Sequence, residues 1–345
     1  MSQQNIDNAV EMNLRVLEDQ RQIIISQIKL NCIKFIAFPI LILGGVIFVF
    51  KEKFLLLNKE FDEFPLYALL FLVFAIALAG IVYFYTKGKQ KFEAIYKDTL
   101  VKPLMEKLYP NLQYSPKEYV DEMHFQNSNL FYQGYTNYGG DDFFSGEIEN
   151  VHVEFSELKV IKSSRNEDGS NSNKNNSTIF SGLFLHTKLE KAVPGQIILD
   201  PMLLYLEKMQ LPGFILGLIK SVLPNYGKVV KTGNVEFDDN FKLHCENEEV
   251  ATEVMNPKFT QKILEIAGKL KEINSTRLKK GVDPASILSH GVFLKLSIVN
   301  DSLYFAIFGN KFFDVNFKKS TLESKQSIIL SVAYINMLVD IAKSV

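Results

Sequence analysis

The sequence has no tryptophan and little cysteine, and these gaps narrow the classes of protein to which it can belong. Its 345 residues include only two cysteines, Cys32 and Cys245. Two cysteines cannot build a disulfide framework, and no C-x-x-C pair or cysteine–histidine ligand cluster is present. We therefore expect reduced thiols and a main domain that lies in the cytosol. The 28 phenylalanines and 14 tyrosines are typical of an aromatic core and of membrane segments.

Charge of one sign and catalytic signatures are also lacking. The 38 Lys and Arg residues balance 39 Asp and Glu residues, and the net charge of −1 gives no general attraction for nucleic acid. The signatures G-x-S-x-G, G-x-x-x-x-G-K-S/T and G-x-G-x-x-G are missing, so the commonest hydrolase and NTPase classes lose support. No H-E-x-x-H or H-x-H spacing groups the five histidines, which are His124, His152, His186, His244 and His290. From motifs we therefore predict no catalytic residue, no cofactor and no metal ion.

Two long runs without any charge stand near the N-terminus. They are FIAFPILILGGVIFVF at residues 35–50 and PLYALLFLVFAIALAGIVYFY at residues 65–85. A helix needs about 20 apolar residues to cross a bilayer, and the first run reaches this length when it starts at residue 31. A signal peptide would begin near residue 1, but a polar segment comes first. We predict a transmembrane hairpin over residues 31–85, with spans at about 31–50 and 65–85.

Basic residues beside the two spans predict the orientation. Four precede the first span, three lie in the loop 51–63, and five follow the second span within residues 87–102. The excess outside the loop places both termini in the cytosol by the positive-inside rule. Anionic lipid attracts lysines next to a span by about 1 kcal/mol each, although such lysines can also serve only to set the topology. We predict four membrane-interface residues, called the interface lysines below: Lys34, Lys87, Lys89 and Lys91.

Amphipathic patterns flank the hairpin on both sides. Apolar residues recur at helical spacing through residues 6–30, with Arg21 interrupting the stripe, and again through residues 86–116. We predict a cytosolic helix within residues 1–30 and a membrane-proximal helix at 86–116. The two helices would either form an antiparallel stalk that continues the hairpin or pack separately on the globular domain.

Residues 117–345 carry strand and helix patterns in mixed order, which predicts an α+β fold class of antiparallel strands with packed helices. A helix is predicted to begin at Pro257. A hairpin is predicted to turn at Asn300–Asp301. The other predicted strands are Gly146–Phe155, Leu158–Lys162, Ile179–Leu189, Gln196–Leu199, Val235–Phe237, Phe241–Cys245 and Phe312–Phe317.

Three further segments have an unusual composition. Residues 163–178 contain no hydrophobic residue and predict a flexible loop. Residues 211–224, LPGFILGLIKSVLP, are too short to span a bilayer, so we favour a buried helix over a membrane contact or a partner-binding groove. The apolar C-terminal segment 322–342 has an uncharged stretch only from Ser327 to Val339. This length favours a helix packed on the sheet over a third span.

Four stretches resemble a bacterial family of two-pass membrane proteins, domain of unknown function 3137. The stretches are FQNSNLF at 125–131, DDFFSGEIENVHVEFSELK at 141–159, IFSGLFLHTKLEKAVPGQIILDP at 179–201, and the segment 235–264. In the last, the family pattern of spaced aromatic and small residues is matched by Phe237, Phe241, Leu243, Ala251 and Pro257. The resemblance implies two membrane spans and a shared fold. That family has no established activity, so the resemblance implies no functional residue.

The absence of catalytic motifs favours a non-enzymatic module, anchored in the bacterial inner membrane, that binds a protein or lipid partner through its cytosolic domain. One alternative is a membrane enzyme. Its residues to test are Asp141 and Asp142, which follow a Gly-Gly pair and could hold a divalent ion from a turn, together with His152. The other alternative is a structural protein that self-associates through residues 6–30.

Overall fold

The computed structural model describes residues 3–49, 64–165, 174–201, 212–214, 226–278, 294–309, 313 and 315–344. The chain divides into two compact units. Unit 1 comprises residues 1–104 and 314–326, and unit 2 comprises residues 105–313 and 327–345. The predicted domain 117–345 therefore differs from the observed division, because a segment close to the C-terminus belongs to the unit of the N-terminal helices. The predicted loop 51–63 and nearly all of the apolar segment 211–224 lie outside the described residues.

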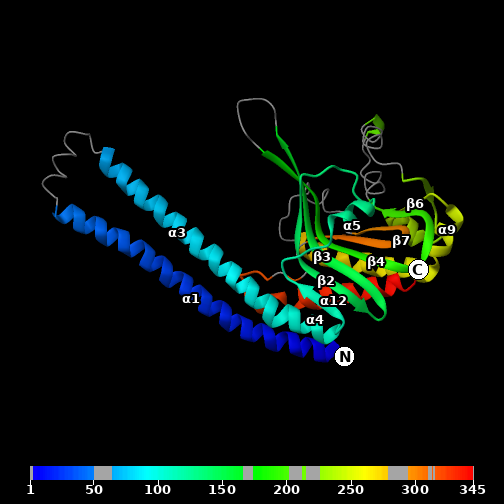
Figure 1. Cartoon of the computed structure of the whole chain (residues 1–345), viewed down its shortest axis with the longest axis horizontal. Helices are drawn as coiled ribbons and strands as arrows, with labels where there is room; N and C mark the ends of the chain where they lie inside the picture. Colours follow the sequence, from blue (N-terminus) through cyan, green and yellow to red (C-terminus); the bar gives the residue numbers. More distant parts are fainter. Residues whose placement is uncertain are drawn as a thin grey trace. The chain divides into compact units, whose positions relative to one another are not determined.

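Unit 1 is built on two long helices, α1 (Gln3–Val49) and α3 (Phe64–Tyr96), coloured blue and cyan in Figure 1. The amphipathic helix and the first predicted span are one continuous helix, α1. After Tyr96 the chain runs on through a π-helical turn, η1 (Lys97–Val101), and α4 (Lys102–Leu108). The helix predicted over 86–116 thus ends earlier than expected, because strand β1 (Leu112–Ser115) follows.

Small residues on α3 face large side chains of α1. A Cβ added to Gly80 would collide with the ring of Phe35, and one added to Gly88 would collide with the side chain of Ile28. The pairing of higher numbers on α3 with lower numbers on α1 makes the two helices antiparallel. The glycines let the backbones approach closely, as small residues do between packed apolar helices.

Unit 2 contains a sheet in which every pair of described strands is antiparallel, as the sequence predicts. The strand order is β1-β2-β3-β4-β6-β5, and β7 also pairs with β4. Strand β4 is 27 residues long and serves as the centre, because β3, β7 and β6 all pair with it. Besides β1, the strands are β2 (Asn137–Ile148), β3 (Val151–Arg165), β4 (Lys174–Asp200), β5 (Lys228–Val230), β6 (Lys242–Cys245) and β7 (Leu294–Phe308).

Two strand predictions are wrong at asparagine residues. The stretch Gly146–Phe155 is a hairpin, because Glu149 and Asn150 adopt φ values of 51° and 70° and turn the chain from β2 into β3. Two residues with positive φ form the turn that best fits the twist of a hairpin. The converse holds at Asn300. Although its φ is also positive, at 55°, it lies within one continuous strand, β7.

Two other predicted strands are not found among the residues that the structure describes. Residues 235–237 begin a helix, α8 (Val235–Asn240), because the side chain of Asn234 accepts a hydrogen bond from the Phe237 N–H and caps it. Residues 316–319 form a turn closed by hydrogen bonds from the N–H groups of Lys318 and Lys319 to Asn316. Strand pairing continues to Arg165 and Lys174, so both ends of the loop predicted at 163–178 belong to strands β3 and β4. Residues 166–173 lie outside the described residues.

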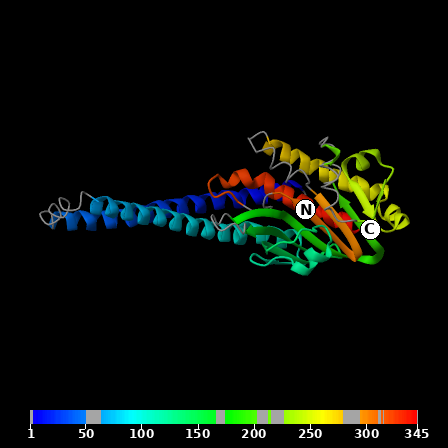
Figure 2. The ribbon, with the colours of Figure 1, turned by 90° about the horizontal axis from the view of Figure 1, so that it is seen from above.

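Helices cover both faces of the sheet. Figures 1 and 2 show α10 (Pro257–Leu278) and α12 (Lys325–Ala342) along one face, with α5 (Glu122–Asn127) on the other. The C-terminal helix is packed, as predicted. Most of its apolar side chains are buried, and the Lys262 Nζ of α10 donates to the carbonyl oxygen of Asp340 at 2.6 Å. The remaining helices are α9 (Glu248–Val254) and the 3-10 helix η2 (Thr321–Ser324).

The core on the α5 face is rich in aromatic residues. Phe125 of α5 is buried and its ring lies 5.5 Å from that of Phe184 in β4 and 4.5 Å from that of Phe131. Asp121 caps the helix by accepting the Met123 N–H at 2.7 Å. This packing fixes α5 over β3 and β4. It therefore also positions the preceding residue of the helix, His124, above the sheet.

Candidate functional site

Both α1 and α3 are long and apolar enough to cross a membrane, by length and composition. The apolar stretches, Val10–Leu41 and Phe71–Leu108, overlap the predicted spans. Their side chains are largely exposed in the protein itself: Phe38 is 67% exposed and Phe71 is 72% exposed. A core helix of a water-soluble protein buries such residues, since each Å² of apolar surface left in water costs roughly 25 cal/mol. The exposure of these side chains is consistent with helices that could cross a membrane.

The four interface lysines are all exposed on these helices. The rings of Phe35 and Phe84 are in contact, with centroids 5.6 Å apart. Lys34 of α1 and Lys87 of α3 therefore lie at similar heights along the two antiparallel helices. The Lys87 Nζ lies 5.1 Å from the centroid of the Tyr83 ring, and the Lys89 Nζ lies 3.1 Å from Glu93 Oε1. Basic groups thus lie near the start of the first predicted span, 31–50, and just after the second, 65–85.

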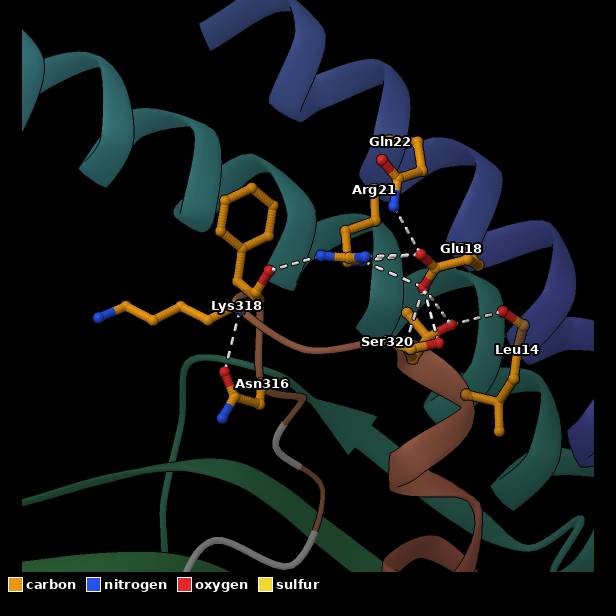
Figure 3. Close-up of polar contacts among 9 residues, drawn as sticks. Leu14, Glu18, Arg21, Gln22, Asn316, Lys318 and Ser320 are labelled. Atoms are coloured by element: carbon orange, nitrogen blue, oxygen red, sulfur yellow. Dashed lines mark hydrogen bonds and ion pairs between the residues drawn. The ribbon is translucent and has the colours of Figure 1, made fainter. Parts of the chain in front are cut away.

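Arg21, which interrupts the apolar stripe of α1, is the centre of a buried polar contact within unit 1 (Figure 3). Its side chain is only 9% exposed. The guanidinium donates from Nε and Nη2 to the carboxylate of Glu18 at 3.1 and 2.6 Å, and from Nη1 to the carbonyl oxygen of Phe317 at 3.1 Å. Arg21 therefore joins α1 to the chain segment at 314–326. We refer to Glu18, Arg21, Phe317 and Thr321 as the clasp.

Glu18 holds the other side of the clasp. Its Oε2 accepts the N–H of Thr321 at 2.8 Å, and the Thr321 hydroxyl donates to the carbonyl oxygen of Leu14 at 2.7 Å. The ring of Phe317 lies 5.4 Å from that of Phe92 on α3. The hydrogen bonds from Arg21 lower the pKa of the Glu18 carboxyl to about 2. Every charge of the clasp is thus paired, which is what a buried charge needs to persist in a fold.

A second polar group lies on the α5 face of the sheet in unit 2. Glu154 of β3 and His186 of β4 are register partners, so both side chains leave the sheet on the same face. His124 reaches them from α5: its Nε2 and the Nδ1 of His186 lie 3.4 and 3.5 Å from Glu154 Oε2. The two imidazole rings stack with centroids 3.9 Å apart. We call these three residues the histidine cluster.

The sequence interpretation missed this cluster, because it treated the five histidines as scattered. The spacing H-x-E at 152–154 was a weak signal, since alternate residues of a strand share a face. His152 does approach Glu154, but its Nε2 contacts the other oxygen, Oε1, at 3.8 Å. The pairing of Glu154 with His186 depends on sheet register, which short-range spacing does not reveal.

Of the residues suggested for an enzyme site, Asp141 and Asp142 come together, whereas His152 lies on the other face of the sheet. Asp141 and Asp142 lie within β2 and not in a turn, and Asp142 occupies a bulge with a φ of 58°. Their carboxylates gather with that of Glu157, on the sheet face opposite to Glu154 and His152. Protein groups already occupy the acids: Glu157 accepts the Phe313 N–H at 2.8 Å, and Asp142 accepts the Tyr114 hydroxyl at 2.5 Å.

A buried ion pair lies elsewhere in unit 2. The Lys295 Nζ of β7 is 2.7 Å from Asp200 Oδ2 at the end of β4, and both side chains are less than a tenth exposed. The ammonium also lies 5.5 Å from the Phe131 ring centroid. Burial lowers the pKa of the nearby His244 imidazole. Charge pairing accounts for this cluster, as it does for the clasp.

A model of one known protein family matches part of the chain. Residues 178–280 match the model of the family described as Protein of unknown function (DUF3137). The comparisons with curated proteins and with solved structures found no match. The matched range holds the signature residues; four of them are buried and the fifth opens α10, so they specify the fold: Phe237, Phe241, Leu243, Ala251 and Pro257. The match confirms the resemblance to the DUF3137 family over residues 178–280.

Proposed function

We propose that the chain is an integral membrane protein and a non-enzymatic binding module. In this proposal α1 and α3 cross the bacterial cytoplasmic membrane as a hairpin and hold unit 2 on the cytosolic side, where it binds a protein or lipid partner. The exposed apolar surface of the two helices carries the proposal. Charged residues at positions 11–21 and the clasp support a membrane-crossing part of α1 that begins after residue 30.

Membrane fractionation tests the anchor. The full-length protein is expected in the membrane pellet after extraction with alkaline carbonate, and its release into the supernatant would contradict the proposal. The double variant Phe38→Asp/Leu41→Asp places two charges on the exposed face of α1, each costing about 2.5–3.5 kcal/mol at a helix centre, and should reduce the pellet fraction. Met12→Asp, which alters an equally exposed residue outside the proposed span, should leave it unchanged.

Labelling of single cysteines tests the orientation. In a background of Cys32→Ser and Cys245→Ser, the variant Lys59→Cys should react with a membrane-impermeant maleimide in spheroplasts. Ser344→Cys should react only after the membrane is permeabilised. Reaction of the C-terminal cysteine in intact spheroplasts would place unit 2 outside and remove the cytosolic part of the proposal. The distribution of lysines supports the expected outcome.

Crosslinking in intact cells, followed by purification from membranes, tests the binding role. A specific protein crosslinked to unit 2 would support a protein partner, and co-purified anionic lipid would support a lipid partner through the interface lysines. A preparation that contains only the chain itself would argue against the binding module.

The alternative of self-association through residues 6–30 has less support. The apolar stripe of that segment, including Leu14, Leu17 and Ile24, is already buried within unit 1.

A further inference from the structure

The histidine cluster has the composition of a metal site. We propose that it binds a divalent transition-metal ion of the zinc class through His124 Nε2, His186 Nδ1 and Glu154 Oε2, with water in the fourth position. Two imidazoles and one carboxylate are the ligands of zinc sites that keep an open coordination position. Ca²⁺ and Mg²⁺ prefer oxygen ligands and fit this set poorly. The inference is independent of the membrane anchor.

The distances between ligand atoms agree with this assignment. Atoms about 2.0–2.2 Å from a tetrahedral zinc ion lie roughly 3.3–3.6 Å from one another. The contacts of His124 Nε2 and His186 Nδ1 with Glu154 Oε2, at 3.4 and 3.5 Å, match two such edges. All three ligand atoms lie within 4.8 Å of one another. The edge between the two imidazoles, at most 4.8 Å, must take the same length when an ion binds.

His124 is the ligand that can make this adjustment. Its side chain is 31% exposed, and its ring lies nearly parallel to that of His186, with an angle of 20° between the planes. Because an imidazole donates its lone pair in the ring plane, the ring of His124 must turn about its side-chain bonds to face the ion. His186 is fixed by comparison: it is buried, and its ring packs on Tyr304 with centroids 5.1 Å apart.

The polar atoms of His186 are the observation that points to a ligand. Its side chain is 4% exposed, and neither ring nitrogen makes a hydrogen bond to any residue that the structure describes. Buried polar atoms nearly always have a partner, so an unsatisfied imidazole points to a bound ion or water. Its Nδ1 lies 3.5 Å from Glu154 Oε2, and a bound ion would occupy the space between the two groups.

Zinc titration of the full-length protein tests the proposal. The protein, purified in detergent without an affinity tag and stripped of metal, is titrated with Zn²⁺ alone, and bound zinc is measured after dialysis. One ion per chain with micromolar or tighter affinity is expected. Replacement of Zn²⁺ by Co²⁺ should give the visible absorption of a four-coordinate site. A chain that retains no zinc at micromolar concentration would overturn the proposal.

Variants with matched controls separate this site from surface binding. Glu154→Gln keeps the side-chain shape, and His124→Ala removes an exposed ligand. Each should weaken zinc binding by roughly tenfold or more. His152→Ala removes an imidazole beside Glu154 that is 51% exposed and outside the ligand set, and Glu118→Gln neutralises an exposed acid that precedes α5 in the sequence. Both controls should bind zinc like the parent protein.

The outcomes are distinct even where a variant is unstable. The melting temperature of each zinc-free variant shows whether it is folded, and bound zinc should raise the melting temperature of the parent and of the controls only. Equal zinc binding by the parent and by folded Glu154→Gln protein would show adventitious binding and overturn the site. A loss in His152→Ala as large as that in His124→Ala would overturn the assigned ligand set.

Discussion

The clasp of unit 1 and the histidine cluster of unit 2 both bury titratable side chains, but they satisfy them differently. In the clasp, Arg21 donates to Glu18 and to a main-chain carbonyl, and Glu18 accepts from Thr321 as well. In the histidine cluster, both ring nitrogens of the buried His186 lack a hydrogen bond to the described residues. The clasp makes its hydrogen bonds within the chain, whereas the buried His186 has only the 3.5 Å contact of its Nδ1 with Glu154 Oε2.

The difference separates structural roles from functional ones. A buried charge with all of its hydrogen bonds made within the chain stabilises one arrangement, here the attachment of residues 314–326 to α1. A buried polar group that the fold leaves unpaired costs free energy, and such groups persist mainly at sites that bind something. The comparison can be tested by removing each group and measuring stability with and without metal.

The largest expected effect is that of Arg21→Ala on stability. The variant leaves the Glu18 carboxylate partly buried without its cation, and the loss should be about 3 kcal/mol in the free energy of unfolding. The detergent-purified protein would be unfolded with denaturant and followed by circular dichroism. Arg15→Ala is the matched control, because Arg15 also pairs with an acid of α1 but its side chain is 72% exposed.

Exposed ion pairs contribute about 0–1 kcal/mol, so the control should lie close to the parent protein. Equal losses in Arg21→Ala and Arg15→Ala would show that the clasp is no more stabilising than a surface pair. The claim that the clasp stabilises the fold through its buried charges would then fail.

A smaller effect is expected from pH. The pKa of Glu18 is about 2 in the folded protein, against 4.5 for an ordinary glutamate. Its folded-state pKa is depressed, so the contribution to stability is complete above about pH 4.5 and is lost as the pH falls toward 2. The full shift would correspond to about 3 kcal/mol, which we reduce to about 1–2 kcal/mol because the side chain is 22% exposed.

Melting temperatures of the parent protein and Glu18→Gln, measured from pH 7 down to pH 3, check this expectation. The parent should be the more stable at pH 7, and the two curves should converge as the acid is protonated. Curves that stay parallel over the whole range would mean that Glu18 does not titrate in the clasp as its contacts indicate.

Much of the fold was predictable from local sequence, and the failures have a common physical cause. Proline opened α10 as predicted, and the apolar period located α12. Two asparagines with positive φ account for wrong predictions of opposite kinds. Asn150, predicted within a strand, turns the chain, whereas Asn300, predicted in a turn, does not. At Asn300 the irregularity is taken up by β4, where the pairing jumps between Lys188 and Val193. The partner strand decides the outcome, and it is remote in sequence.

The clasp and the histidine cluster depend even more on residues that are remote in sequence. The break that Arg21 makes in the apolar stripe was visible, but its partner Phe317 lies 296 residues away. The histidine cluster needs the register of β3 against β4 and the position of α5, which aromatic packing around Phe125 sets. By contrast, the two apolar helices are local features, and they were recognised from composition alone.

The smallest expected effect is the most direct test of the unsatisfied group. His186→Phe replaces the buried imidazole with an apolar ring that can keep the contact with Tyr304. Because no hydrogen bond to the described residues is lost, the zinc-free variant should be as stable as the parent or more stable, by up to about 1 kcal/mol. The same substitution should abolish the rise in melting temperature that zinc gives the parent. A loss of more than about 2 kcal/mol without zinc would mean that His186 is satisfied by the protein itself. In that case the two buried groups would not differ in kind, and the histidine cluster would be structural like the clasp.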